Sequence, residues 1–280
     1  MNVTADIDFL EKMYFYFDEP VVYNVKKGYV KIKPVSLRLS EIFLSSFGIL
    51  TIDKNAIPNP KIIQMSYLRF LYDFVLDKNT EEGQTNIQRL SNILKMCLEL
   101  EKPSIKINEF NKLILCDKDK DIEITEKQFD EIKKILLYQN ILHYDDEYIN
   151  PEMKEVIQEM NELKNKDMVI PSLERKMAII TAHTGLSKKE QENMTYRSHC
   201  LLFEEVCGET EFITVRPAAL MCGSNKMEHW IYKKKKEKLA DYVKSVDSYT
   251  KSMGGGKAIK STSTTTNGES YLLQYNNFNK

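Results

Sequence analysis

The strongest constraint on the fold is a dense series of helix start and stop signals between residues 125 and 248. Thr125 is followed three residues later by Gln128, and Ser187 is followed by Glu190, so each pair forms a capping box. Asn150 before Pro151 marks another helix start, and Ser172 starts a helix that Gly185 ends. Two more helices are expected, one from Thr195 to about residue 207 and a long one over 228–248. Short helices on short connections predict a bundle-like helical block.

A β-hairpin is predicted near the N-terminus. Residues 21–25 and 29–33 are rich in β-branched and aromatic side chains, and the Lys-Lys-Gly sequence between them places Gly28 at the turn. Pro34 cannot donate a ladder hydrogen bond, so the second strand should end there. A single hairpin is marginally stable in water, and we therefore expect it to pack on other elements.

Helical spacing replaces the β pattern from residue 37 onward. Leu39, Ile42, Phe43 and Phe47 recur at intervals of three and four, which predicts a helix that stops at Gly48. Two more helices are expected over 62–76 and 86–100, and a small β-insertion over 105–107, 113–115 and 122–124. The predicted fold is therefore mainly α, with an N-terminal β-hairpin, a small β-insertion and a C-terminal helical block.

Three regions follow from these patterns. Residues 1–124 form an N-terminal α+β region, and residues 125–250 form the helical block. Residues 251–280 contain a Gly-Gly-Gly run and a Ser/Thr run, and are expected to be a disordered low-complexity tail.

Composition excludes several classes of protein. Forty basic residues against forty-one acidic ones give a net charge of −1, which argues against a protein that coats nucleic acid. No apolar run approaches the roughly 18–20 residues that a membrane-spanning helix needs, and the first residues lack the pattern of a secretory signal. Five irregularly spaced cysteines are typical of reduced thiols in a cytosol. We therefore expect no membrane association.

Two groups of residues suggest metal sites, and neither meets the requirements of such a site. Asp117, Asp119 and Asp121 alternate as in a calcium loop, but Ile122 and Gln128 stand where an EF-hand needs Gly and Glu. Cys200 and Cys207 would lie about 10 Å apart along one helix, which is too far for a shared zinc ion. The other zinc candidates are His199, Cys222 and His229. The sequence predicts no metal and no cofactor. It also predicts no enzyme, although a folded cleft that gathers Cys200 or Cys207 with a histidine would favour an enzyme of unrecognised type.

Residues 172–207 also raise the question of DNA binding, because a helix, a Gly-containing turn and a further helix resemble a helix-turn-helix. The candidate recognition helix carries one basic residue, Arg197, and the acidic pair Glu204 and Glu205. A packing helix is the favoured interpretation, and nucleic acid is not the expected partner. A nucleic-acid-associated regulator that uses this segment and the Lys-rich helix remains the alternative.

Several stretches carry a resemblance to a known group of proteins. They are 60–68 (PKIIQMSYL), 138–140 (YQN) with 144–146 (YDD), 171–174 (PSLE) and 229–236 (HWIYKKKK). Together with the order hairpin, helical body and low-complexity tail, they resemble tail-assembly chaperones and virion morphogenesis proteins of tailed bacteriophages of low-GC Gram-positive hosts. The resemblance implies a non-enzymatic protein that binds other phage tail or virion proteins, in the host cytoplasm during assembly or in the virion.

Candidate contacts with such a partner come from two of the predicted helices. The 62–76 helix is rich in aromatic side chains, and the last helix carries a basic run beside a tryptophan. The predicted contact residues are Tyr67, Phe70, Tyr72, Phe74, Trp230, Lys233, Lys234, Lys235 and Lys236.

Overall fold

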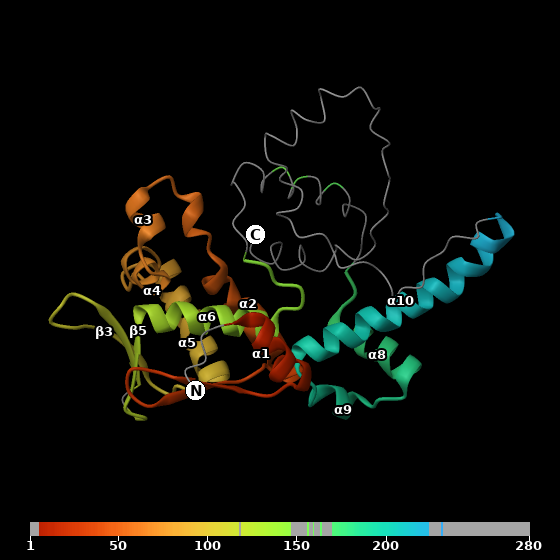
Figure 1. Cartoon of the computed structure of the whole chain (residues 1–280), viewed down its shortest axis with the longest axis horizontal. Helices are drawn as coiled ribbons and strands as arrows, with labels where there is room; N and C mark the ends of the chain where they lie inside the picture. Colours follow the sequence, from red (N-terminus) through yellow and green to blue (C-terminus); the bar gives the residue numbers. More distant parts are fainter. Residues whose placement is uncertain are drawn as a thin grey trace, which may run out of the picture. The chain divides into compact units, whose positions relative to one another are not determined.

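A computed structural model of the chain describes residues 6–117, 119–146, 156, 159, 163, 170–223 and 231 (Figure 1). The fold is mainly α with two small antiparallel sheets, as the sequence predicts. Contacts divide the chain into two compact units. Unit 1 comprises Met1–Tyr144 and Ser172–Val206, and unit 2 comprises Asp145–Pro171 and Cys207–Lys280. The predicted helix start at Asn150, most of the predicted 228–248 helix and the predicted tail lie outside the described residues.

Unit 1 begins with helix α1 (Ile7–Met13) and the 3₁₀ turn η1 (Phe15–Phe17), which lead into the predicted hairpin. Strands β1 (Val21–Asn24) and β2 (Tyr29–Ile32) pair antiparallel, with Val21 opposite Ile32. Buried and exposed residues alternate along both strands, so one face packs on the core. Gly28 adopts φ +82° at the turn, a value that glycine tolerates best. The hairpin prediction is confirmed.

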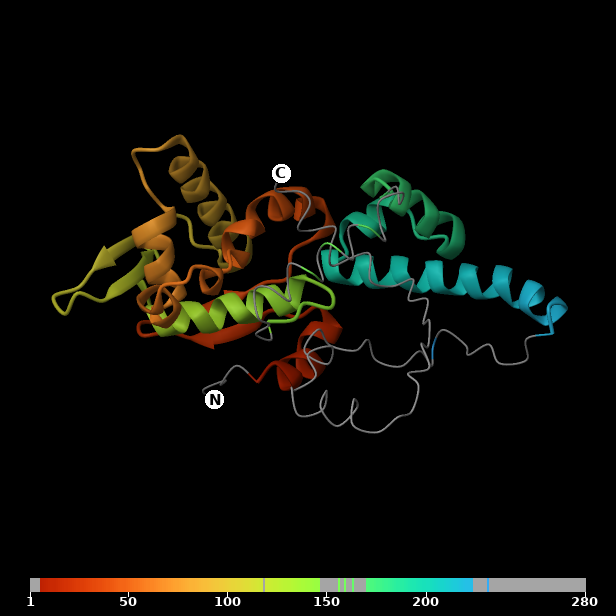
Figure 2. The ribbon, with the colours of Figure 1, turned by 90° about the horizontal axis from the view of Figure 1, so that it is seen from above.

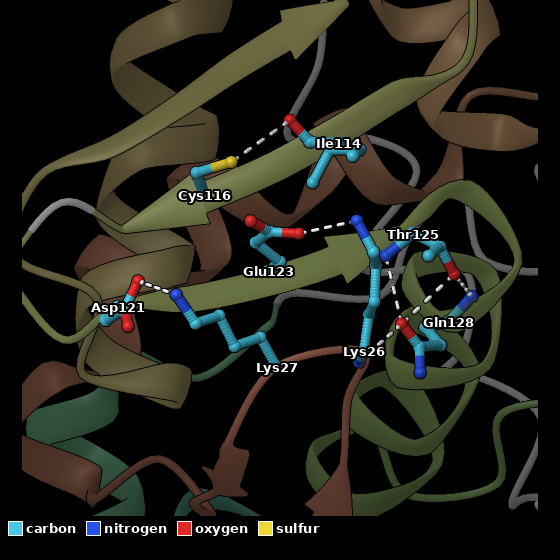
Figure 3. A network of polar contacts seen from close by, with 8 residues as sticks. All are labelled: Lys26, Lys27, Ile114, Cys116, Asp121, Glu123, Thr125 and Gln128. Atoms are coloured by element: carbon cyan, nitrogen blue, oxygen red, sulfur yellow. Dashed lines mark hydrogen bonds and ion pairs between the residues drawn. The ribbon is translucent and has the colours of Figure 1, made fainter. Parts of the chain in front are cut away.

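The second sheet is the predicted β-insertion. It consists of β3 (Pro103–Ile107), β4 (Leu113–Asp117) and β5 (Ile122–Thr125), in the order β3-β4-β5. The hairpin tip reaches this sheet through a bridge between Lys27 and Glu123. Two ion pairs reinforce this contact (Figure 3). Lys26 Nζ lies 2.6 Å from the carboxylate of Glu123, and Lys27 Nζ lies 2.5 Å from the carboxylate of Asp121. The two sheets are therefore joined at the tip of the hairpin.

The central helices are longer than the sequence suggests. The 3₁₀ turn η2 (Leu37–Leu39) leads into α2 (Ser40–Thr51), which packs against α5 (Glu81–Leu98). The predicted stop at Gly48 is wrong, because the buried face of α2 continues through Ile49 and Leu50 and burial outweighs the weak helix preference of one glycine. Helix α5 also begins before the expected residue 86, at a cap provided by Thr80.

The predicted helix over 62–76 is not continuous. It divides into α3 (Pro60–Gln64), α4 (Tyr67–Phe70) and the π-helical turn η4 (Leu71–Val75). Lys54, at the start of the 3₁₀ turn η3 (Lys54–Ala56), donates hydrogen bonds to the carbonyl oxygens of Ile63, at 2.7 Å, and Met65. Ser66 caps α4. These contacts stabilise the end of one helix and the start of the next in adjacent residues, so the helix is interrupted there.

Helix α6 (Glu126–Asn140) begins at the predicted capping box of Thr125 and Gln128, which is confirmed. Both views show α6 beside the β1–β2 hairpin, which it contacts through β2 (Figures 1 and 2). The C-terminal end of α6 also contacts the residues that follow the hairpin, since Asn140 Oδ1 accepts a hydrogen bond of 2.7 Å from the backbone N–H of Val35. Helix α6 is therefore a central support of unit 1.

The remaining described helices are α8 (Leu173–Thr184), α9 (Lys188–Glu192) and α10 (Tyr196–Met221). Gly185 ends α8 at φ +78°, and the capping box of Ser187 and Glu190 starts α9, both as predicted. Helix α10 was expected to end near residue 207 and continues to Met221 through Pro217. Residues 172–206 join the N-terminal elements through backbone hydrogen bonds from Leu37 to Met194 and from Tyr196 to Val35.

Candidate protein-binding surfaces

The structure separates the four predicted aromatic contacts into two pairs. Tyr67 and Phe70 are buried in the core of unit 1, so they cannot contact a partner from the surface of this structure. Tyr72 and Phe74 are 40 % and 57 % exposed, and we call this pair the π-turn surface. Their role in contact stays a prediction. The other predicted contacts lie outside the described residues: Trp230, Lys233, Lys234, Lys235 and Lys236.

The buried pair supports Phe74 from the core side. The rings of Phe70 and Phe74 are stacked with centroids 6.0 Å apart, and those of Tyr67 and Phe70 are 5.9 Å apart. The Tyr67 hydroxyl donates a hydrogen bond of 2.9 Å to the carbonyl oxygen of Ile49, and burial raises the pKa of Tyr67 above its usual value. Tyr67 is therefore a neutral internal support, and the π-helical turn presents the next two aromatic residues outward.

A second exposed apolar surface lies on α1 and η1. Phe9, Met13, Tyr16 and Phe17 are between 48 % and 69 % exposed, whereas Leu10 and Phe15 of the same segment are buried. We call these four exposed residues the N-terminal face. Positions 9 and 13 have the spacing of one helical stripe, but the helix ends at Met13 and Tyr16 and Phe17 belong to a separate 3₁₀ turn. Spacing within the sequence therefore does not show that these four side chains are all exposed.

The segment that carries the N-terminal face is bound to the start of α10 by polar contacts. Arg197 pairs with Glu11 at 2.5 Å and donates a hydrogen bond of 2.7 Å to the carbonyl oxygen of Tyr138. Asp18 adopts φ 57° and accepts hydrogen bonds from the hydroxyls of Thr195, at 2.6 Å, and Ser198, at 2.8 Å. Charge-assisted hydrogen bonds of this kind fix α1 and η1 in one position. The exposed face is thus a preorganised surface.

The rim of the N-terminal face is acidic. Asp6, Asp8 and Glu19 are exposed in the same segment, each within three residues of one of its exposed apolar side chains, and Lys12 is the exposed cation there. Three carboxylates and one ammonium leave a formal charge of −2 around four apolar side chains. Such a surface complements an apolar partner segment that carries positive charge.

The start of α10, which was weighed as a DNA-recognition helix, is oriented by the same contacts. The side chains of His199, Phe203 and Val206 in the first half of α10 are buried, and Arg197 is occupied by Glu11. Glu204, one of the two acidic residues, pairs with His143 at 3.0 Å. This part of α10 packs against the rest of unit 1, which is the interpretation that the sequence favours.

Two of the cysteines and two of the aspartates in the described residues have structural roles, whereas Cys207 and Cys222 are exposed. Burial raises the pKa of the Cys97 and Cys200 thiols to about 12, which keeps both protonated and unreactive at neutral pH. Two aspartates of the rejected calcium-loop candidate form ion pairs with lysines. Asp119 lies 3.1 Å from Lys102 Nζ, and Asp121 lies 2.5 Å from Lys27 Nζ. Among the described residues, no group of three or more histidines, cysteines or carboxylates could hold a metal ion.

Within the described part of the chain, no helix combines the length and apolarity needed to cross a membrane. No protein-family model, curated protein sequence or solved structure matches the chain.

Proposed function

We propose that this protein acts by binding other proteins during the assembly of a tailed bacteriophage, as a tail-assembly chaperone or a virion morphogenesis protein. The observation that carries the proposal is the π-turn surface, where Tyr72 and Phe74 are exposed on a turn whose neighbouring aromatics are buried. Anchored, exposed aromatic residues are typical of the centres of protein interfaces. The sequence resemblance supplies the assembly context.

Preorganisation explains why this surface suits binding. Phe74 stacks on the buried Phe70, so its position is set before a partner arrives. Phe74 therefore loses less side-chain entropy when a partner binds than an aromatic residue on a flexible loop would. The arrangement needs no reacting group, because capture of a client depends on the burial of apolar area.

Co-expression with the proteins encoded by neighbouring genes tests the proposal. We expect a tail or virion protein to co-purify with the wild type, and the double substitution Tyr72→Ser, Phe74→Ser to weaken capture at least about tenfold, as loss of interface aromatics commonly does. Phe110→Ser is the matched control, because Phe110 is 81 % exposed on the turn between β3 and β4. Circular dichroism of each variant verifies the fold.

Two results would contradict the proposal. Neighbouring genes that encode no tail or virion protein would remove its assembly context. Equal capture by the wild type and the Tyr72, Phe74 variant would show that the π-turn surface does not bind the client.

A further inference from the structure

The N-terminal face has the size of a docking site for one chain segment. Fully buried aromatic side chains contribute about 150–250 Å² each, so the exposed fractions of Phe9, Met13, Tyr16 and Phe17 sum to roughly 400–500 Å². A stable interface between two subunits needs about 800 Å² on each side. The face is therefore too small for a whole-subunit interface and large enough for a single short segment.

Its charge selects the kind of segment. Exposed Asp6, Asp8 and Glu19 belong to the same segment, within three residues of an exposed apolar side chain, and Lys12 offsets one of their charges. A segment that combines aromatic or aliphatic residues with several lysines would bury the apolar area and neutralise this rim. The same acidic rim disfavours an anionic membrane surface, which attracts basic segments instead.

The chain itself contains a segment of that chemistry. Trp230, Ile231 and Tyr232 are followed directly by Lys233, Lys234, Lys235 and Lys236. Three large apolar side chains next to four cations match the apolar area and the negative charge of the N-terminal face.

We propose that the N-terminal face of one copy binds residues 230–236 of a second copy. Each copy then offers one face and one basic segment, so the contact is heterologous, and repeated pairing produces a ring or an open chain of copies. The small area makes each contact weak, and the charges make it sensitive to salt. This self-association goes beyond the capture of a client and leaves the π-turn surface available for it.

Sedimentation velocity of the purified full-length protein tests the proposal in the absence of any client. We expect the average mass to rise with protein concentration at low salt and to fall toward the monomer at high salt. A face variant, Met13→Ser with Phe17→Ser, and a lysine variant, Lys233→Glu with Lys235→Glu, should each associate at least about tenfold more weakly, as loss of interface hot spots commonly does. Phe110→Ser, which removes an exposed aromatic residue elsewhere in unit 1, should behave as the wild type.

Mixing the two variants gives the sharpest result. The face variant retains its lysines and the lysine variant retains its face, so an equimolar mixture should form a heterodimer that does not grow further. A wild type that stays monomeric at every concentration, variants that assemble as the wild type does, or a mixture that fails to pair would each overturn the proposal. Because no client is present, these outcomes are independent of client capture through Tyr72 and Phe74.

Discussion

Acid is expected to destabilise this protein through one buried histidine. His199 is 1 % exposed on α10, and its Nε2 atom has no hydrogen-bond partner among the described residues. Burial, assisted by the nearby Lys176 ammonium, lowers the pKa of His199 from 6.5 to about 4. The folded protein therefore holds this imidazole neutral at pH values where the unfolded chain protonates it.

The sign and size of the effect follow from proton linkage. Well above pH 6.5 the imidazole is neutral in both states, and its contribution to the free energy of unfolding does not change with pH. As the pH falls toward 4, the unfolded state gains a proton that the folded state resists, so stability is lost. With a pKa of about 4 in the folded state and 6.5 in the unfolded state, the loss reaches about 3 kcal/mol at pH 4.

Urea unfolding followed by circular dichroism between about pH 7.5 and pH 4 measures this loss. The substitution His199→Leu removes the titrating group, so the wild type should lose about 3 kcal/mol more than the variant across this range. His183→Leu is the matched control, because it makes the same replacement at an exposed histidine of α8. Parallel curves for the wild type and His199→Leu would refute the reasoning.

Three substitutions test the packing of unit 1, each measured by the denaturation midpoint. Gly83→Ala should destabilise by more than about 2 kcal/mol although alanine favours helices, because a Cβ there would lie 1.8 Å from the Asp77 carbonyl oxygen; an unchanged midpoint would contradict this close approach. Asn140→Ala should cost about 1–3 kcal/mol, because it leaves the Val35 N–H buried without its acceptor; a smaller loss than for an exposed asparagine would count against it. Thr125→Ala should cost about 1 kcal/mol through loss of the helix cap, and restoration by Ser would verify the mechanism.

Local signals in the sequence predicted those elements whose stabilising contacts lie within a few residues. The capping boxes at Thr125 and Ser187 need a partner only three residues away. The turn at Gly28 needs a left-handed conformation that this residue tolerates by itself. For such features the sequence neighbourhood contains the whole physical cause, and each prediction is confirmed.

Predictions that depended on distant partners were wrong or incomplete. The 62–76 segment has continuous helical spacing, yet Lys54 and Ser66 divide it at Met65. Asp130 supports the division by accepting a hydrogen bond of 3.0 Å from the Tyr67 N–H. Ser66 is a local cap, but Lys54 and Asp130 come from other elements, and periodicity within the 62–76 segment carries no information about them.

The candidate surfaces divide in the same way. The sequence identified the aromatic content of the 62–76 segment, but the choice of Tyr72 and Phe74 as the exposed pair depended on how α4 and η4 pack. The outward orientation of Phe9 and Phe17 depends on the contact of Glu11 with Arg197, 186 positions later in the chain.

By itself, the sequence determined the class of the fold, the hairpin, the β-insertion and the helix caps, because each rests on backbone preferences and on contacts between near neighbours. Only the tertiary structure decided which apolar side chains are covered. Burial is a property of the surfaces that pack against a side chain, and here those surfaces come from residues as far apart as Asp18 and Ser198.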